Sequence, residues 1–259
     1  MASTGTVVSA GKTHPDAVLG VGRRLRLAGL LIVLSVAVLP LLFASIRIFL
    51  VGEQPSSGAV LYYRYANSVL MQLTSLALLL YVLRQNGQTI RDFGLEFRSA
   101  DARRSLLLDT LLLAFGGRLA YRVAYIVIVR FYQSALGHTP KPPYIPSYIP
   151  PAALGLSVLT IVFVIVNPLF EELIVRCFLI SEVTALTGSS VFAVGLSVVL
   201  QTTYHLYQGV PNALAFGGAF LIFSIYYVKR GRIIPIVLAH LWFDVLGAIV
   251  YPLLRGRHL

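Results

Sequence analysis

The chain has 259 residues, of which 57% are hydrophobic and 12% are charged, and its formal net charge is +11. A soluble domain carries about 25% charged residues, so this composition, with a mean hydropathy of +0.81, excludes an ordinary soluble protein and indicates a polytopic membrane protein. The excess positive charge is mostly arginine in the tails and short connections, a pattern typical of orientation in the bilayer and of contact with anionic lipid headgroups. Nucleic-acid binding is not expected, because basic stripes with interleaved aromatic residues are absent. The single cysteine excludes an internal disulfide.

The apolar runs predict an all-α fold, a transmembrane helical bundle of about seven to eight spans with an active site in an intramembrane polar cavity. The predicted helices lie at about 27–50, 62–83, 105–132, 152–185, 191–207, 212–228 and 233–254. We divide the chain into a flexible tail at 1–22, amino-terminal transmembrane helices at 23–150, catalytic-core helices at 151–254 and a basic tail at 255–259.

Positive charge in the short connections predicts which way the bundle faces. The arginine-rich start, the connection at 84–104 and the turn at 229–232 all favour the cytoplasm, so the amino terminus is predicted to be cytoplasmic. Seven spans would leave Arg255 and Arg257 outside, a conflict that a re-entrant element or a different span count would remove. The short tails and the lack of an evident cleavable signal favour a bacterial plasma membrane.

The third apolar run contains four charged residues. Asp109 and Arg118 are too far apart for an i,i+4 pair, so their partners are expected on other helices or in lipid headgroups. Arg122 shares a face with Arg118, and Arg130 lies near the end of the run. A helix lying partly against the protein or at the membrane interface would explain this pattern.

Ionisable residues within apolar runs are the strongest functional signal. Glu171, Glu172 and Asp244 lie in such runs, whereas Glu182 is one of the acidic residues expected in water. An ionisable group at bilayer depth costs roughly 2.5–3.5 kcal/mol, so it indicates function and requires a partner. The partners that we propose are His205, His240 and Asp244.

The spacing of these residues predicts that they converge. Helices 152–185 and 191–207 form an antiparallel hairpin, in which Glu171 precedes Gly188 by seventeen residues and His205 follows it by seventeen. At a rise of 1.5 Å per residue both lie about 25 Å from the turn, at matching depth. His240 and Asp244 are four residues apart and share one helix face.

Three chemistries suit this set of residues. It can bind a divalent metal and activate its water, it can use Glu171 as a general base with a histidine donating to the oxyanion, or it can relay protons or cations. Arg176 most simply pairs with Glu172. Structural alternatives exist for single residues: a helix-end histidine for His205, a hydrogen-bonded His240–Asp244 pair and a Glu172–Arg176 ion pair. Charged and histidine groups on three helices together favour a site.

Three motifs carry a resemblance to a known family. Glu-Glu-x-x-x-Arg at 171–176, His205 followed by Tyr-Gln-Gly at 207–209, and His-x-x-x-Asp at 240–244 resemble the CAAX-protease and bacteriocin-processing (CPBP or Abi) family of intramembrane endopeptidases, which includes the CAAX prenyl protease 2 type. The resemblance covers about 150–248. Gln201 departs from the family, which commonly has phenylalanine there, and Asp244 stands where asparagine is common.

The resemblance implies proteolysis near the membrane. It makes Glu171 the catalytic base, with His205 and His240 assisting at the water or the oxyanion and Asp244 completing the catalytic set, and with Glu172 and Arg176 in support. The cofactor is either none or a divalent, zinc-like metal held by the four catalytic residues. The implied partner is a peptide or protein substrate at the bilayer, of the CAAX or bacteriocin-processing type.

Two other functions remain open at the level of sequence. A non-catalytic scaffold or immunity protein could use the same fold, and Asp109 with the arginines of its helix motivates a small transporter. The transporter is disfavoured because no inverted repeat or pair of broken helices is evident. The sequence does not predict the oligomeric state.

Overall fold

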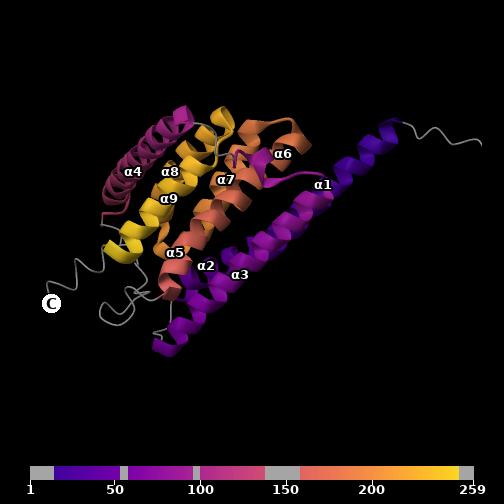
Figure 1. The fold of residues 1–259 in the computed structure, drawn as a ribbon. Helices are drawn as coiled ribbons and strands as arrows, with labels where there is room; N and C mark the ends of the chain where they lie inside the picture. Colours follow the sequence, from indigo (N-terminus) through magenta and orange to yellow (C-terminus); the bar gives the residue numbers. More distant parts are fainter. Residues whose placement is uncertain (1–14, 53–57, 96–99, 138–157, 251–259) are drawn as a thin grey trace, which may run out of the picture.

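The structure is a computed structural model that describes residues 15–52, 58–95, 100–137 and 158–250. Every regular element in these ranges is helical (Figure 1), which confirms the predicted all-α fold for the described residues. The α-helices are α1 (Pro15–Ala37), α2 (Leu39–Val51), α3 (Gly58–Gln85), α4 (Ala100–Leu136), α5 (Val158–Glu171), α6 (Leu179–Thr187), α7 (Ser190–Tyr204), α8 (Val210–Arg230) and α9 (Ile234–Val245). The 3-10 helices are η1 (Ile90–Phe93) and η3 (Leu206–Gln208), and the π-helices are η2 (Glu172–Phe178) and η4 (Leu246–Val250).

Five stretches of the described chain are long and apolar enough to cross a membrane, namely Gly22–Val51, Tyr62–Gln85, Ser105–Leu136, Val158–Thr187 and Val210–Arg230. The other two predicted spans correspond to shorter apolar helices, α7 and α9. The chain is therefore a multi-pass membrane protein by the length and composition of its helices. The basic tail predicted at 255–259 lies outside the described residues.

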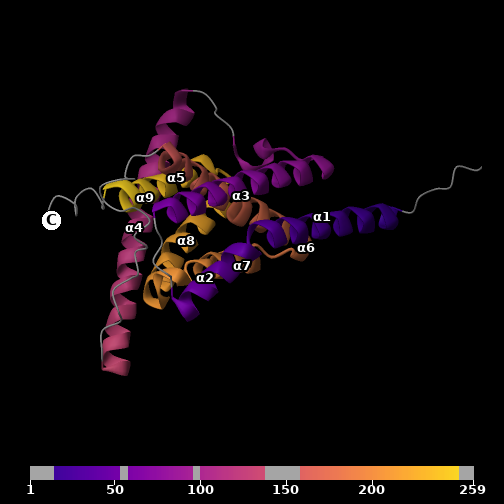
Figure 2. The same ribbon diagram turned by 90° about the horizontal axis from the view of Figure 1, so that it is seen from below.

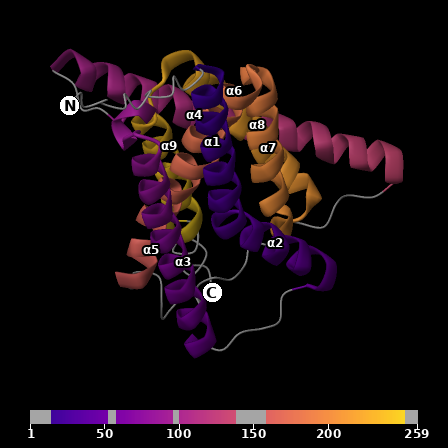
Figure 3. The ribbon, with the colours of Figure 1, turned by 90° about the vertical axis from the view of Figure 1, so that its right-hand side faces the viewer.

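The first predicted span is two helices rather than one. α1 begins at Pro15, so the end of the predicted tail at 1–22 is helical. The chain breaks after Ala37, and Pro40 lies in the first turn of α2. Proline has no N–H to donate within a helix, so it is tolerated at a helix start but interrupts a continuous one. In Figure 3, α2 turns away from α1, and it packs against α7 and η3.

α4 runs across the bundle at a steep inclination to α1 and α3 (Figure 2) and packs against α8 and α9. Its Asp109 accepts a hydrogen bond from Tyr226 of α8 at 2.7 Å and forms an ion pair with Arg232 at 2.9 Å. This confirms the prediction that the partners of Asp109 come from outside its own helix. Arg118 lies over the ring of Tyr121, with its guanidinium carbon 5.5 Å from the ring centre.

The segment that carries the two adjacent glutamates lies at the centre of the bundle. Phe170, Ile174 and Phe178 are completely buried there. The connection after α3 packs closely against the turn after α8: Gly94 has a φ of 79°, and a Cβ added to it would lie 1.8 Å from the carbonyl oxygen of Gly231. Only glycine allows the two backbones to approach so closely.

The burial of Glu182 differs from the prediction made from the sequence. It was predicted to lie in water, but its side chain is buried on α6. Arg26 of α1 and Gln88 each contact its Oε1 at 3.3 Å. A buried carboxylate needs such partners, because removing a charge from water without compensation is costly.

Candidate active site

The site is built around an irregular helix. Pro168 lies inside α5, where it cannot donate the usual hydrogen bond to the residue four before it. From Glu172 to Phe178 the helix changes to the π form, in which N–H groups bond five residues back. Glu171 is the last residue of α5, whereas Glu172 and Arg176 lie within η2. Single π-turns within α-helices are frequent at functional sites.

Glu172 and Arg176 form a fully buried ion pair, as predicted. Arg176 donates from Nε to Glu172 Oε2 at 2.6 Å and from Nη2 to Oε1 at 3.3 Å, and both side chains are 0% exposed. Its Nη1 donates to the Phe220 carbonyl at 3.0 Å and to Ser224 Oγ at 2.5 Å. The guanidinium also lies over the ring of Phe223. These donors and rings offset the cost of burying the charges.

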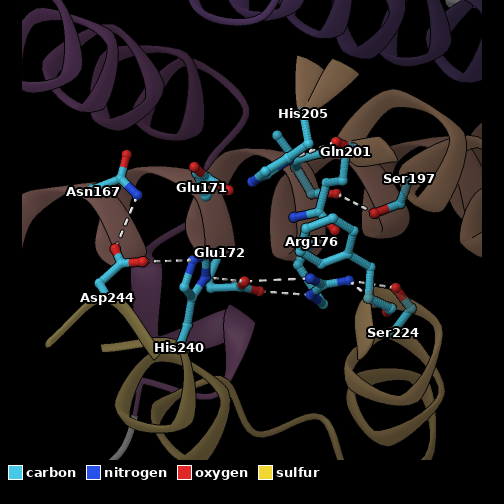
Figure 4. Close-up of polar contacts among 12 residues, drawn as sticks. Asn167, Glu171, Glu172, Arg176, Ser197, Gln201, His205, Ser224, His240 and Asp244 are labelled. Carbon is cyan, nitrogen blue, oxygen red and sulfur yellow. Dashed lines mark hydrogen bonds and ion pairs between the residues drawn. The ribbon is translucent and has the colours of Figure 1, made fainter. Parts of the chain in front are cut away.

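His240 lies between two carboxylates (Figure 4). Its Nδ1 is 2.7 Å from Glu172 Oε1, and its Nε2 is 3.7 Å from Asp244 Oδ1. A carboxylate can only accept, so the ring donates its Nδ1 hydrogen to Glu172. The sequence predicted the contact with Asp244 but missed the shorter one with Glu172, because it crosses from α9 to η2.

A chain of side-chain amides holds Asp244 from the other side. Asn167 donates to Asp244 Oδ2 at 3.1 Å, and Gln72 of α3 donates to Asn167 Oδ1 at 2.8 Å. Sequence reasoning missed both amides. Each is a polar residue within an apolar run, the same signal that singled out the glutamates, and Asn167 precedes Glu171 by one helical turn.

Glu171 and the end of α7 are brought together, as the hairpin spacing predicted. The hydroxyl of Tyr204 donates to Glu171 Oε2 at 2.7 Å. The next residue, His205, is buried, and its Nδ1 is 2.8 Å from the backbone carbonyl of Gln201. A carbonyl only accepts, so Nδ1 carries the hydrogen, and Nε2 of the neutral ring is an acceptor. Figure 4 shows His205 on the same side of the cluster as Glu171.

The turn after His205 is held by α2. Ser45 Oγ donates to the Thr203 carbonyl at 3.2 Å and accepts from the Tyr207 N–H at 3.0 Å. α7 therefore ends at Tyr204 and not at 207 as predicted, and η3 and Gly209 follow with a φ of 88° at the glycine. His205 is thus a helix-end histidine, but it is buried, and Ser45 holds the backbone both before and after it.

The arrangement does not fit the predicted metal ligands. Among the described residues, no group of three or more His, Cys, Asp or Glu side chains is placed to hold one metal ion. His240 Nδ1 is occupied by Glu172, and Asp244 accepts from Asn167. These four side chains therefore do not support a mechanism through a metal held by them.

These features define a polytopic helical membrane protein with a buried cluster of carboxylates, histidines and amides. Residues 153–246 match the family model described as Rce1-like, type II CAAX prenyl endopeptidase, which confirms the family predicted from the motifs. The match covers about a third of the chain and includes all the predicted site residues, whereas α1–α4 lie outside it. No curated protein and no solved structure matches the chain.

Proposed function

We propose that this protein is an intramembrane endopeptidase in which Glu171 activates a water molecule for attack on a peptide bond. The observation that carries the proposal is the environment of Glu171. It is a buried carboxylate at the edge of a π-helix, with no ion-pair partner among the described residues and with a hydrogen bond from Tyr204. Glu172, by contrast, is bound by both Arg176 and His240. A carboxylate that accepts a hydrogen bond but forms no ion pair among the described residues, beside one that is fully paired, suits a base that must gain and release a proton.

The reaction assigns a task to each side chain. Glu171 takes one proton from water while the water oxygen bonds to the substrate carbonyl carbon, and the acceptor Nε2 of His205 holds the other water hydrogen. The carbonyl oxygen becomes an oxyanion that His240 can stabilise. In this role the His240 ring is an imidazolium: its Nδ1–H stays with Glu172 and its Nε2–H donates to the oxyanion, since 3.7 Å to Asp244 is too long for a committed hydrogen bond. Glu171 then gives its proton to the leaving amine as the carbon–nitrogen bond breaks.

The family description supports a CAAX-type peptide as the substrate. We propose that a membrane-bound peptide or protein reaches the site from the bilayer, with the amino terminus of the enzyme in the cytoplasm of a bacterial cell. The motivation for a transporter is weakened, because Asp109 is paired with Arg232 away from this cluster. No observation favours the non-catalytic scaffold specifically.

The test is hydrolysis by the purified protein in detergent. The probes are a quenched fluorescent peptide ending in a farnesylated cysteine and three residues, the same peptide without the lipid, and an unprenylated peptide library. Products are identified by mass spectrometry, with and without a chelator. Cleavage that persists in chelator supports the proposal, and a wild type that cleaves none of the probes contradicts it.

The hydrogen bonds from Gln72 to Asn167 and from Asn167 to Asp244 predict that Gln72 affects catalysis, although Gln72 lies outside the residues that match the family model. In Gln72→Leu, Asn167 loses the donor that fixes its orientation. Asp244 then loses the oriented amide that donates to it, and His240 loses a fixed carboxylate beside its Nε2. Misplacement of a catalytic group by a fraction of an ångström to 1 Å is costly, so we expect kcat to fall roughly 10- to 100-fold. Steady-state kinetics on a cleaved peptide measure this. Wild-type kcat in a folded Gln72→Leu variant would show that the chain does not position the site.

A further inference from the structure

Gln201 is a buried polar residue of the site with no function assigned so far. It lies on α7, one turn before His205, and its side chain is 0% exposed. Its backbone carbonyl is used by His205 Nδ1, but neither its side-chain Nε2 nor its Oε1 has a hydrogen-bond partner in the described part of the chain. Burying an unpaired donor and an unpaired acceptor is costly, and such groups require an explanation.

The position of the amide suggests what it binds. Figure 4 shows the side chain of Gln201 directed from α7 into the space between His205 and Arg176, next to the cluster. The other donors nearby are committed: Tyr204 donates to Glu171, and Arg176 donates to Glu172, to a carbonyl and to Ser224. Gln201 therefore brings to this part of the cluster an amide that interacts with the Tyr204 side chain but makes no hydrogen bond of ordinary geometry among the described residues.

We propose that the carboxamide of Gln201 binds a peptide unit of the substrate beside the bond that is cleaved. A carboxamide and a peptide unit are complementary, because each carries one N–H donor and one carbonyl acceptor. Nε2–H donates to the substrate carbonyl, and Oε1 accepts the substrate N–H. This inference rests on the proposed peptidase function and gives Gln201 a substrate-binding task separate from the proton transfer by Glu171.

A purely structural role makes the opposite prediction for stability. If Gln201 supported the fold through hydrogen bonds, its replacement by an apolar residue of similar volume would lower the melting temperature. An unpaired buried amide instead predicts that Gln201→Met leaves the melting temperature unchanged or raises it. Ser197 is the matched contrast on the same helix, because it is also fully buried but its Oγ donates to the Val175 carbonyl at 2.7 Å. Ser197→Ala should therefore lower the melting temperature.

The experiment measures hydrolysis and melting for the wild type, Gln201→Met and Ser197→Ala. The probe is the quenched peptide that the wild type cleaves fastest among those above. A second peptide has an ester oxygen in place of the N–H next to the cleaved bond. For the amide peptide, kcat/KM of Gln201→Met should fall roughly 10- to 100-fold, mainly through KM. The ester should weaken turnover by the wild type but add little further loss in Gln201→Met, because both changes remove the same hydrogen bond.

Each other outcome rejects the inference. Unchanged kinetics in Gln201→Met, with the wild type active, overturn the role of Gln201 and leave the proposed function intact. A lower melting temperature with normal KM assigns Gln201 to the fold. If the loss caused by Gln201→Met and the loss caused by the ester multiply when the two are combined, the changes are independent, and the amide of Gln201 does not contact this peptide unit. A wild type that cleaves no peptide overturns both proposals.

Discussion

Glu171→Gln is expected to abolish peptide hydrolysis while the protein stays folded. Glutamine keeps the size of the side chain and can still accept from Tyr204, but it cannot take a proton from water. General-base catalysis contributes roughly 10²- to 10⁴-fold, so kcat should fall by at least that range. Single-turnover hydrolysis of the fastest-cleaved peptide measures the loss, and the melting temperature in detergent shows that the fold is retained.

Glu182→Gln is the control for this substitution. Glu182 is another buried glutamate on the same helical stretch, Val158–Thr187. Its partners, Arg26 and Gln88, lie away from the cluster, so the substitution removes a buried charge without changing the site. Its rate per folded molecule should stay near that of the wild type. Hydrolysis by Glu171→Gln at the rate of Glu182→Gln would remove Glu171 from the mechanism.

Arg176→Met is expected to have the largest effect on stability. The change leaves the carboxylate of Glu172 buried with His240 as its remaining partner and removes the donors to Ser224 and to the Phe220 carbonyl. Breaking a buried ion pair by removing one partner costs about 3–5 kcal/mol. We expect a large drop in melting temperature and low recovery of monodisperse protein from detergent.

A double variant separates the two roles of this pair. Glu172→Gln with Arg176→Met removes both charges, so much of the lost melting temperature should return. Hydrolysis should remain low, because His240 then lacks the charged partner on its Nδ1. A single Arg176→Met variant that melts like the wild type would show that the buried ion pair does not support the fold.

Spacing within and between neighbouring helices could be read from the sequence. The equal distance of Glu171 and His205 from Gly188 predicted their shared depth, and the Tyr204–Glu171 hydrogen bond bears this out. The i,i+4 relation likewise predicted the pair of Glu172 with Arg176. Both predictions need only the rise of a helix and one short turn.

Contacts between distant helices could not be predicted in the same way. The Glu172–His240 contact, and the amides of Gln72 and Asn167, depend on how α3, η2 and α9 are rotated about their axes. Rotation depends on packing and on local irregularity, and no spacing rule fixes either. The break before Pro40 had a local signal in the proline itself, whereas the π-helix had none beyond Pro168.

The π-helix at Glu172–Phe178 sets how the helical segments before and after it are rotated relative to each other. An α-helix turns about 100° per residue, and a π-turn holds one residue more than an α-turn. If the same residues from Glu172 to Phe178 took regular α-helical bonding instead, each would turn the chain further, and everything beyond them would be rotated by about 100°. Glu182 would then turn away from Arg26 and Gln88. The π-turn thus takes up one residue more than an α-turn and keeps the acid pair and α6 in phase with their separate partners.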